Sequence, residues 1–247
     1  MSFDTLQKSH LIVKILTCIG VLTNETFRKR FPTIPVIYYK LMIHLPLGFT
    51  IGTCMWLEVV FSEDLNQATD SLAVTLTETD MIVKLISIWY YDKLIKSLFD
   101  AWQHDEMLEL RTTEECSIWQ RTMNMFGIGA FLYIACSLCM VIIALMTVLF
   151  ADTYQLPFAF WTPFNIQNPL QFWYAYFYEA FAMPITCLSN CTMDSFFCYM
   201  IQHFALQFKV VAMRLEKLGT EPKGGDTNDS ITKKLVTLIK HHRKLKK

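Results

Sequence analysis

One stretch of this 247-residue sequence limits its fold more than any other, because residues 126–150 contain no charged side chain. About 20 apolar residues form a helix long enough to cross the hydrocarbon core of a bilayer. Backbone N–H and C=O groups find no water there, so such a stretch must be helical to pair them internally. Charged residues make up only 18% of the chain, against about 25% in soluble domains. The sequence therefore predicts an all-α, polytopic transmembrane helical bundle.

Three further stretches of about 20 residues are apolar enough to be predicted spans: 41–61, 71–91 and 172–193. The second of these is the least apolar, because it contains Glu78, Asp80 and Lys84. The helical pattern of the last one continues to about residue 218, which is too long for the membrane alone. We therefore expect four spans, the last of which projects into water.

The positions of the lysines and arginines predict the orientation of the bundle. Six precede the first span, four lie between the second and third, and eleven follow the fourth. The two remaining connections hold none. Because Lys and Arg concentrate in cytoplasmic loops, both ends of the chain are predicted to be cytoplasmic. This excludes the ordinary G-protein-coupled receptor arrangement, whose N-terminus lies outside.

This topology divides the chain into three parts. Residues 1–40 form a cytoplasmic or interfacial segment, and residues 41–206 form the four-span region. Residues 207–247 form a cytoplasmic helical extension, a polar linker at 221–230 and a basic amphipathic helix at 231–247. The apolar face of that helix contains Leu235, Leu238 and Ile239; it either lies on the anionic inner leaflet or packs against a partner, and we favour packing.

The second outer connection, residues 151–171, is rich in aromatic residues and prolines. Aromatic side chains with polar groups concentrate at the membrane–water boundary, so a belt at the lipid interface explains the composition. A hydrophobic lid over a ligand pocket explains it equally well. Both interpretations stay open at this point.

No catalytic, nucleotide-binding or metal-binding signature occurs, which argues against an enzyme and implies no cofactor. A formal net charge of zero gives no basis for nucleic-acid binding. Cys187 and Cys191 lack a His or carboxylate set beside them, so we interpret them as small buried hydrophobes. Asp80 and Lys84 are four residues apart, which predicts a local ion pair. In the alternative interpretation, Glu78 or Asp80 borders a water-filled vestibule.

From Leu156 onward the sequence resembles the insect odorant receptors. That family's second outer loop and fourth span are similar to the run LPFAFWTPFNIQNPLQFWYAYFYEAF. Its cytoplasmic extension of that span, and the next cytoplasmic stretch, resemble the runs MDSFFCYMIQHFALQFKVVAMRLEKLG and LVTLIKHHRKL. Lys84 stands where the family commonly has a lysine, and IKSLFDAW follows it.

The resemblance implies a tetrameric, odorant-gated cation channel in the plasma membrane of olfactory sensory neurons. A tuning subunit with seven spans binds a small volatile odorant and pairs with an olfactory co-receptor subunit. The pore comes from the seventh span, so we expect this chain to be a truncated form without the pore helix.

Ligand pockets of the family lie in the outer half of the bundle and use spans two, three and four among others. By depth, this implies eight candidate ligand-binding residues: Thr75, Thr79, Ile143, Met146, Thr147, Phe177, Tyr178 and Phe181. Of these, we expect Met146, Phe177 and Tyr178 to project inward.

Two other functions remain open from the sequence. An insect gustatory receptor shares the topology, although the LPF…W-x-P pattern of the outer loop favours the odorant branch. A small four-span membrane scaffold or transporter-like protein is the alternative from another class.

The predicted topology can be tested by labelling. Because neither outer connection contains Lys or Arg, tags at Ser2 and Lys247 are both expected to face the cytoplasm. In intact cells, neither tag should react with an impermeant reagent, and both should react after permeabilisation. Labelling of either tag in intact cells would contradict the topology.

Overall fold

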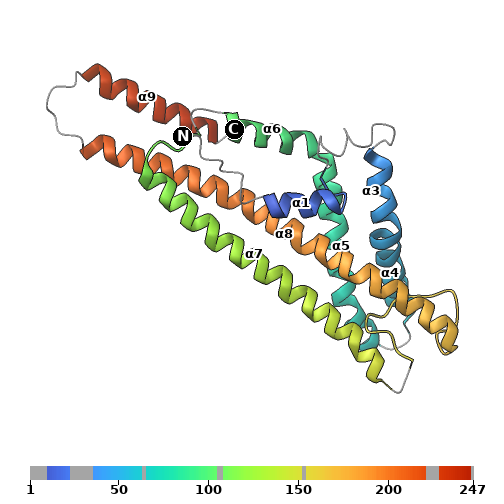
Figure 1. The fold of residues 1–247 in the computed structure, drawn as a ribbon. Coiled ribbons are helices and arrows are strands. Elements are labelled where there is room, and N and C mark those ends of the chain that lie inside the picture. The colour runs from blue at the N-terminus through green and yellow to red at the C-terminus, as the bar shows by residue number, and fades with distance from the viewer. Residues whose placement is uncertain are drawn as a thin grey trace. The chain divides into compact units, whose positions relative to one another are not determined.

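The computed structural model describes residues 10–22, 36–62, 65–104, 108–151, 154–220 and 228–245. Within these ranges the chain is helical apart from turns and connections, and it contains no strand (Figure 1). The helices are α1 (His10–Cys18), α3 (Val36–His44), α4 (Thr50–Phe61), α5 (Leu65–Tyr90), α6 (Asp92–His104), α7 (Thr113–Thr147), α8 (Pro169–Thr220) and α9 (Asn228–Leu245). A π-helical turn, Leu45–Phe49, joins α3 to α4, and a 3-10 turn, Val148–Phe150, ends α7.

The chain divides into two compact units. The span unit comprises Leu11–Leu94 and Gly129–Ser195, and the extension unit comprises Met1–His10, Ile95–Ile128 and Phe196–Lys247. The predicted candidate ligand-binding residues belong to the span unit, whereas the long helical continuations of α7 and α8 belong to the extension unit.

Three helical segments of the described chain are long and apolar enough to cross a membrane: Tyr38–Phe61, Thr113–Phe150 and Pro169–Gly219. They contain three of the four predicted spans. The remaining one, the second predicted span (71–91), lies almost entirely in α5, which is 26 residues long but contains three acidic residues and Lys84. Its length suffices for a bilayer, and its polar groups find partners on other helices, as described below.

The predicted helical continuation of the last span is present, since α8 is a single helix of 52 residues. The predicted amphipathic helix is also present, although α9 begins at Asn228 and not at residue 231. Leu235 and Ile239 lie exposed on it. Residues 221–227 of the predicted linker, and residues 1–9 and 23–35 of the N-terminal segment, lie outside the described residues.

Two glycines let α5 approach the first span closely. A Cβ added at Gly48 would lie 3.1 Å from Cε of Met81, and one added at Gly52 would lie 3.0 Å from Cδ1 of Ile82. Small residues four apart are the typical contact surface between helices in a membrane, where van der Waals contact replaces the hydrophobic effect. Met55, one turn further on, is buried against the same core.

Pro46 accounts for the π-helical turn between α3 and α4. Proline has no N–H to donate, and its ring crowds the carbonyl one turn earlier. The helix widens here, so that the backbone N–H of Thr50 bonds to the carbonyl of Leu45, five residues back. The Thr50 hydroxyl donates to the same carbonyl at 2.9 Å. Residues 36–61 thus remain one continuous helix despite the proline.

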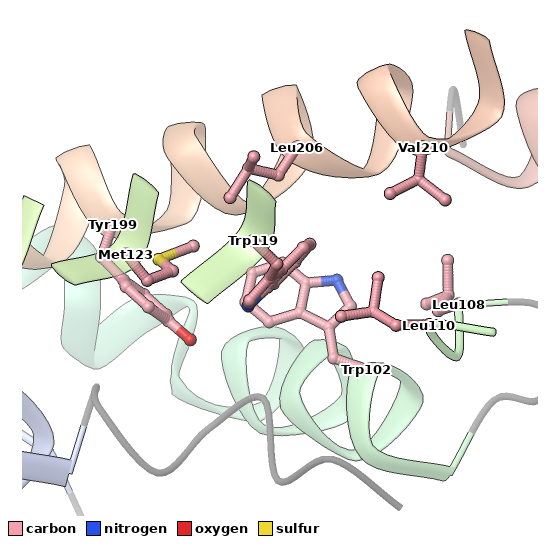
Figure 2. Close-up of a cluster of buried hydrophobic side chains, with 8 residues drawn as sticks. All are labelled: Trp102, Leu108, Leu110, Trp119, Met123, Tyr199, Leu206 and Val210. Carbon is pink, nitrogen blue, oxygen red and sulfur yellow. The ribbon is translucent and has the colours of Figure 1, made fainter. Parts of the chain in front are cut away.

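The extension unit has its own core of buried side chains, shown in Figure 2: Trp102, Leu108, Leu110, Trp119, Met123, Tyr199, Leu206 and Val210. They come from α6, α7, α8 and the segment before α7. His203 lies among them with its ring stacked on Trp102 at 3.6 Å and edge-on to Trp119 at 4.8 Å. An aromatic core of this kind holds the long helices together outside the predicted spans.

Glu115 both caps α7 and ties it to α8 within the extension unit. The Thr112 hydroxyl accepts from the backbone N–H of Glu115 at 3.2 Å, and the Glu115 carboxylate accepts from the backbone N–H of Thr112 at 3.4 Å. This reciprocal pair is a capping box. Arg214 of α8 donates to both Glu115 oxygens at 3.0 and 2.9 Å. A bidentate pair of this geometry fixes the register of the two helices.

The close approach at Gly52 predicts an effect of substitution. Gly52→Leu is expected to lower the free energy of unfolding by about 1–3 kcal/mol, because the new side chain overpacks the contact with Ile82. The thermal midpoint of the purified chain in detergent measures this. The matched control is Gly129→Leu, because a Cβ at Gly129 meets no atom within 4 Å. Equal midpoints for the two variants would contradict the close contact.

Candidate functional site

The loop at residues 154–168, between α7 and α8, folds back against the span unit. Phe160 is only 8% exposed and packs among residues of α4 and α8, including Ile51, Ala182 and Met183. A surface belt of aromatic side chains would leave Phe160 accessible. The structure therefore favours the interpretation of this loop as a cover over the helices.

Two hydrogen bonds anchor this loop. The backbone N–H of Phe158 donates to the Glu179 carboxylate of α8 at 2.8 Å, and the backbone N–H of Trp161 donates to the Cys54 carbonyl of α4 at 3.0 Å. Glu179 is completely buried and is the single charged residue of the predicted fourth span. A hydrogen bond in a low-dielectric setting such as this one is electrostatically stronger than the same bond in water.

A hollow of about 680 Å³ lies between the loop, α4 and α5. Its walls include Glu58 of α4, Asp70, Ser71 and Val74 of α5, and the loop residues 155–162. Neither Glu78 nor Asp80 lines it, so the vestibule expected at those residues is not found here. The hollow is open on one side and has both polar and apolar walls.

Three of the eight predicted ligand-binding residues are buried or half-buried within the span unit. Thr75 is completely buried on α5. One turn further on, the Thr79 hydroxyl accepts from the indole N–H of Trp56 at 2.9 Å. The Tyr178 hydroxyl of α8 donates to the carbonyl of Pro46, which lies in the π-helical turn. Thr79 and Tyr178 thus join α5 and α8 to the first span, whereas the Thr75 hydroxyl donates to the Ser71 carbonyl of its own helix.

The other five predicted residues lie exposed on α7 and α8: Ile143, Met146, Thr147, Phe177 and Phe181. Met146 and Phe177, which we expected to project inward in the full-length receptor, are 46% and 57% exposed in this chain, and their inward orientation stays a prediction. Leu145 and Val148 are the buried residues at that level of α7 and its 3-10 turn. Contact of any of the eight with a ligand stays a prediction.

Phe160 and Glu179 shape this region, although neither was predicted from the sequence to do so. Glu179 carried a signal, since it is the single charge in an otherwise apolar span. Its partner is a backbone N–H in a loop 21 residues earlier, and a backbone group has no sequence signature. Phe160 was one of many aromatic residues in its loop, so nothing singled it out.

Some polar side chains inside the predicted spans are paired, either with another helix or within their own helix. The Thr186 hydroxyl of α8 donates to the Glu78 carboxylate of α5 at 2.9 Å. The predicted ion pair between Asp80 and Lys84 is confirmed. No group of three or more His, Cys, Asp or Glu side chains is placed to hold a metal ion in the described part of the chain.

Comparison with known proteins identifies the family. The sequence model of the family described as 7tm odorant receptor matches residues 64–247. Odorant receptor 94a of Drosophila melanogaster is 37% identical over 179 residues, which are 72% of this chain and 46% of that protein. Odorant receptor 33b of the same fly is 32% identical over 109 residues, which are 42% of this chain and 27% of that protein. The chain thus spans less than half the length of these relatives.

Two solved structures share the fold. The insect olfactory receptor OR5 from Machilis hrabei in complex with eugenol matches with a TM-score of 0.77 at 19% identity. A second structure of OR5 matches with a TM-score of 0.72 at 18% identity. Each match covers 98% of this chain and 64% of the solved chain. At such low identity, the likeness establishes the fold alone.

The apolar helices, and the polar groups that they pair at membrane depth, define a polytopic helical membrane protein. The match over residues 64–247 adds its family: the chain belongs to the insect odorant receptors. This is a family of receptors and not of enzymes. The same match decides for the odorant branch against a gustatory receptor or a four-span scaffold.

The burial of Phe160 predicts that the loop opens when this side chain is removed. Phe160→Ala is expected to weaken the loop's attachment by about 3 kcal/mol, the lower end for loss of a buried Phe side chain. Chymotrypsin should then cut within residues 154–168 much faster in the chain reconstituted in nanodiscs. Phe164→Ala is the control, since Phe164 lies exposed in the same loop. Equal cutting rates for the two variants would contradict the anchored loop.

Proposed function

We propose that this chain is part of the odorant-binding subunit of a heteromeric, ligand-gated cation channel in olfaction. The observation that carries the proposal is the family match over residues 64–247. The fold supports it, because OR5, whose structure this chain resembles, was solved in complex with eugenol. A small organic molecule is the corresponding ligand class for this chain.

The chemistry of the span unit suits a small, mostly apolar ligand. Such pockets combine apolar walls with a few placed polar groups. Here the hydroxyls of Thr75, Thr79 and Tyr178 lie among aliphatic and aromatic side chains. Met146 on α7 and Phe177 on α8 would add polarizable contacts if they project inward in the full-length receptor. We propose that the odorant binds in this half of the span unit, beneath the loop at 154–168.

The exposed faces of α7 and α8 support partners within the membrane. Ile143 and Phe181 are large, apolar and exposed, so they lie against lipid or against further helices of the receptor. We propose an olfactory co-receptor subunit as the partner, in a hetero-tetramer at the plasma membrane of olfactory sensory neurons. Co-purification of the chain with a co-receptor, compared with an unrelated membrane protein of similar size, tests this association.

The ligand proposal predicts altered odorant sensitivity in the receptor that carries this sequence. Alanine at Tyr178, Phe177 or Met146 is expected to raise the half-maximal odorant concentration by about tenfold, which corresponds to about 1.4 kcal/mol of binding free energy. Odorant-evoked current with the co-receptor measures this, and surface labelling checks delivery. Met140→Ala is the control, because Met140 is exposed on α7 and lies outside the proposed pocket. Unchanged dose–response curves for all three variants would contradict this placement of the pocket.

A further inference from the structure

Lys84 of α5 has two carboxylate partners and not one. Its ammonium group forms an ion pair with Asp80, one turn earlier on the same helix. It also lies 2.5 Å from Oδ1 of Asp194 and 3.1 Å from the amide oxygen of Asn190, both on α8. Side-chain exposure is 20% for Lys84, 32% for Asp194 and 54% for Asp80. The inter-helix pair is therefore the better shielded of the two.

A third helix joins this arrangement. The Tyr133 hydroxyl of α7 donates to Oδ2 of Asp194 at 3.3 Å. Each Asp194 oxygen thus has a partner on a different helix. Lys84, Asp194 and Tyr133 thus form a polar cluster that connects α5, α8 and α7 within the span unit.

The charges of this cluster do not balance. Lys84 is the single lysine or arginine within the four predicted spans, and it faces two carboxylates. One ammonium group can neutralise one carboxylate, so Asp80 and Asp194 compete for it. Low effective dielectric constant makes this competition stronger than it would be in water.

We infer that Lys84 is a shared ion-pair partner whose distribution between Asp80 and Asp194 sets how firmly α5 is tied to α8. Pairing with Asp80 is local and leaves the two helices free to separate. Pairing with Asp194 joins helices whose charged residues are 110 positions apart in the sequence. Asp80 therefore weakens the tie between the helices, although it forms an ion pair itself. In the structure Lys84 makes both pairings at once, so Asp80 takes up part of the charge that would otherwise serve Asp194 alone.

This arrangement gives the two aspartates opposite effects, which an ordinary stabilising ion pair would not. Asp80→Asn removes the competitor and leaves a balanced pair, so the thermal midpoint of the chain in nanodiscs should rise by about 2–4 °C. Asp194→Asn removes the tie, so the midpoint should fall by at least as much. Lys84→Met leaves two carboxylates without their ammonium partner and should lower it furthest.

Exchange of the charges tests the inter-helix pair directly. In the Asp80→Asn background, Lys84→Glu alone should lower the midpoint, because the carboxylate that it introduces on α5 would repel Asp194. Adding Asp194→Lys restores an oppositely charged pair and should recover at least half of the loss. The background is needed because Asp80 would otherwise repel the introduced carboxylate as well.

An exposed ion pair supplies the matched control. Lys217 donates to Glu114 at 2.7 Å in the extension unit, with both side chains about half exposed. Lys217→Met should change the midpoint by roughly 1 °C or less, since exposed pairs contribute little. The inference is overturned if Asp80→Asn lowers the midpoint as Asp194→Asn does, or if the charge exchange recovers nothing. The effect of Asp80→Asn on the midpoint can be measured even if Lys84→Met fails to fold, because the Asp80→Asn variant is expected to be more stable.

Discussion

A polar group in hydrocarbon costs several kcal/mol unless it is paired, and the arrangement of the span unit follows from how each such group is paired. Glu179 accepts a backbone N–H from the loop, Glu78 accepts from Thr186, and Lys84 pairs with Asp194. Each of these contacts joins segments that are distant in the sequence. Lipid tails are as apolar as leucine, so apolar contact alone selects no particular neighbour for a helix in a membrane. The few polar groups therefore specify which helices lie together, and the glycine contacts at Gly48 and Gly52 allow them to come close.

The sequence predicted those features of the fold that are local. A charge-free stretch is bound to be a span, a continuing helical pattern extends α8 beyond it, and residues four apart make the Asp80–Lys84 pair. The partner of Lys84 on α8 could not be predicted in this way, because no local sequence pattern relates residue 84 to residue 194. The same holds for Glu179, whose partner is a backbone group. A periodicity of two, three or four residues predicts local structure such as a helix or a strand. Which residue a side chain pairs with in a distant segment is seen only in the three-dimensional structure.

The candidate site was harder to predict for a different reason. In a soluble helix the polar side marks the surface, so the apolar side identifies the core. The stretch 126–150 is apolar on all sides, so its sequence does not indicate which side of the helix faces the rest of the bundle. The depth of a residue in the membrane could be predicted from the length of the span, but the side of the helix that faces inward could not. Met146 and Phe177 were therefore expected to project inward, and they lie exposed in this chain. Thr79 and Tyr178 differ from them, because their hydroxyls form hydrogen bonds with groups of the first span, which lipid cannot replace.

The need to pair polar groups within the membrane also explains why the second predicted span is the least apolar. Its charged groups look unfavourable for a helix in lipid when the helix is considered alone. Asp194 is synthesised 110 residues after Lys84, so Asp80 is the one carboxylate of the two that is present while α5 is being made. The local pair shields Lys84 during that interval, and the contact through Gly48 and Gly52 holds α5 against the first span. In the folded chain Asp194 is the better shielded of the two carboxylates, and the Tyr133 hydroxyl of α7 donates to it. Asp80 is thus the partner that Lys84 has within its own helix, and Asp194 is the partner that it gains from α8.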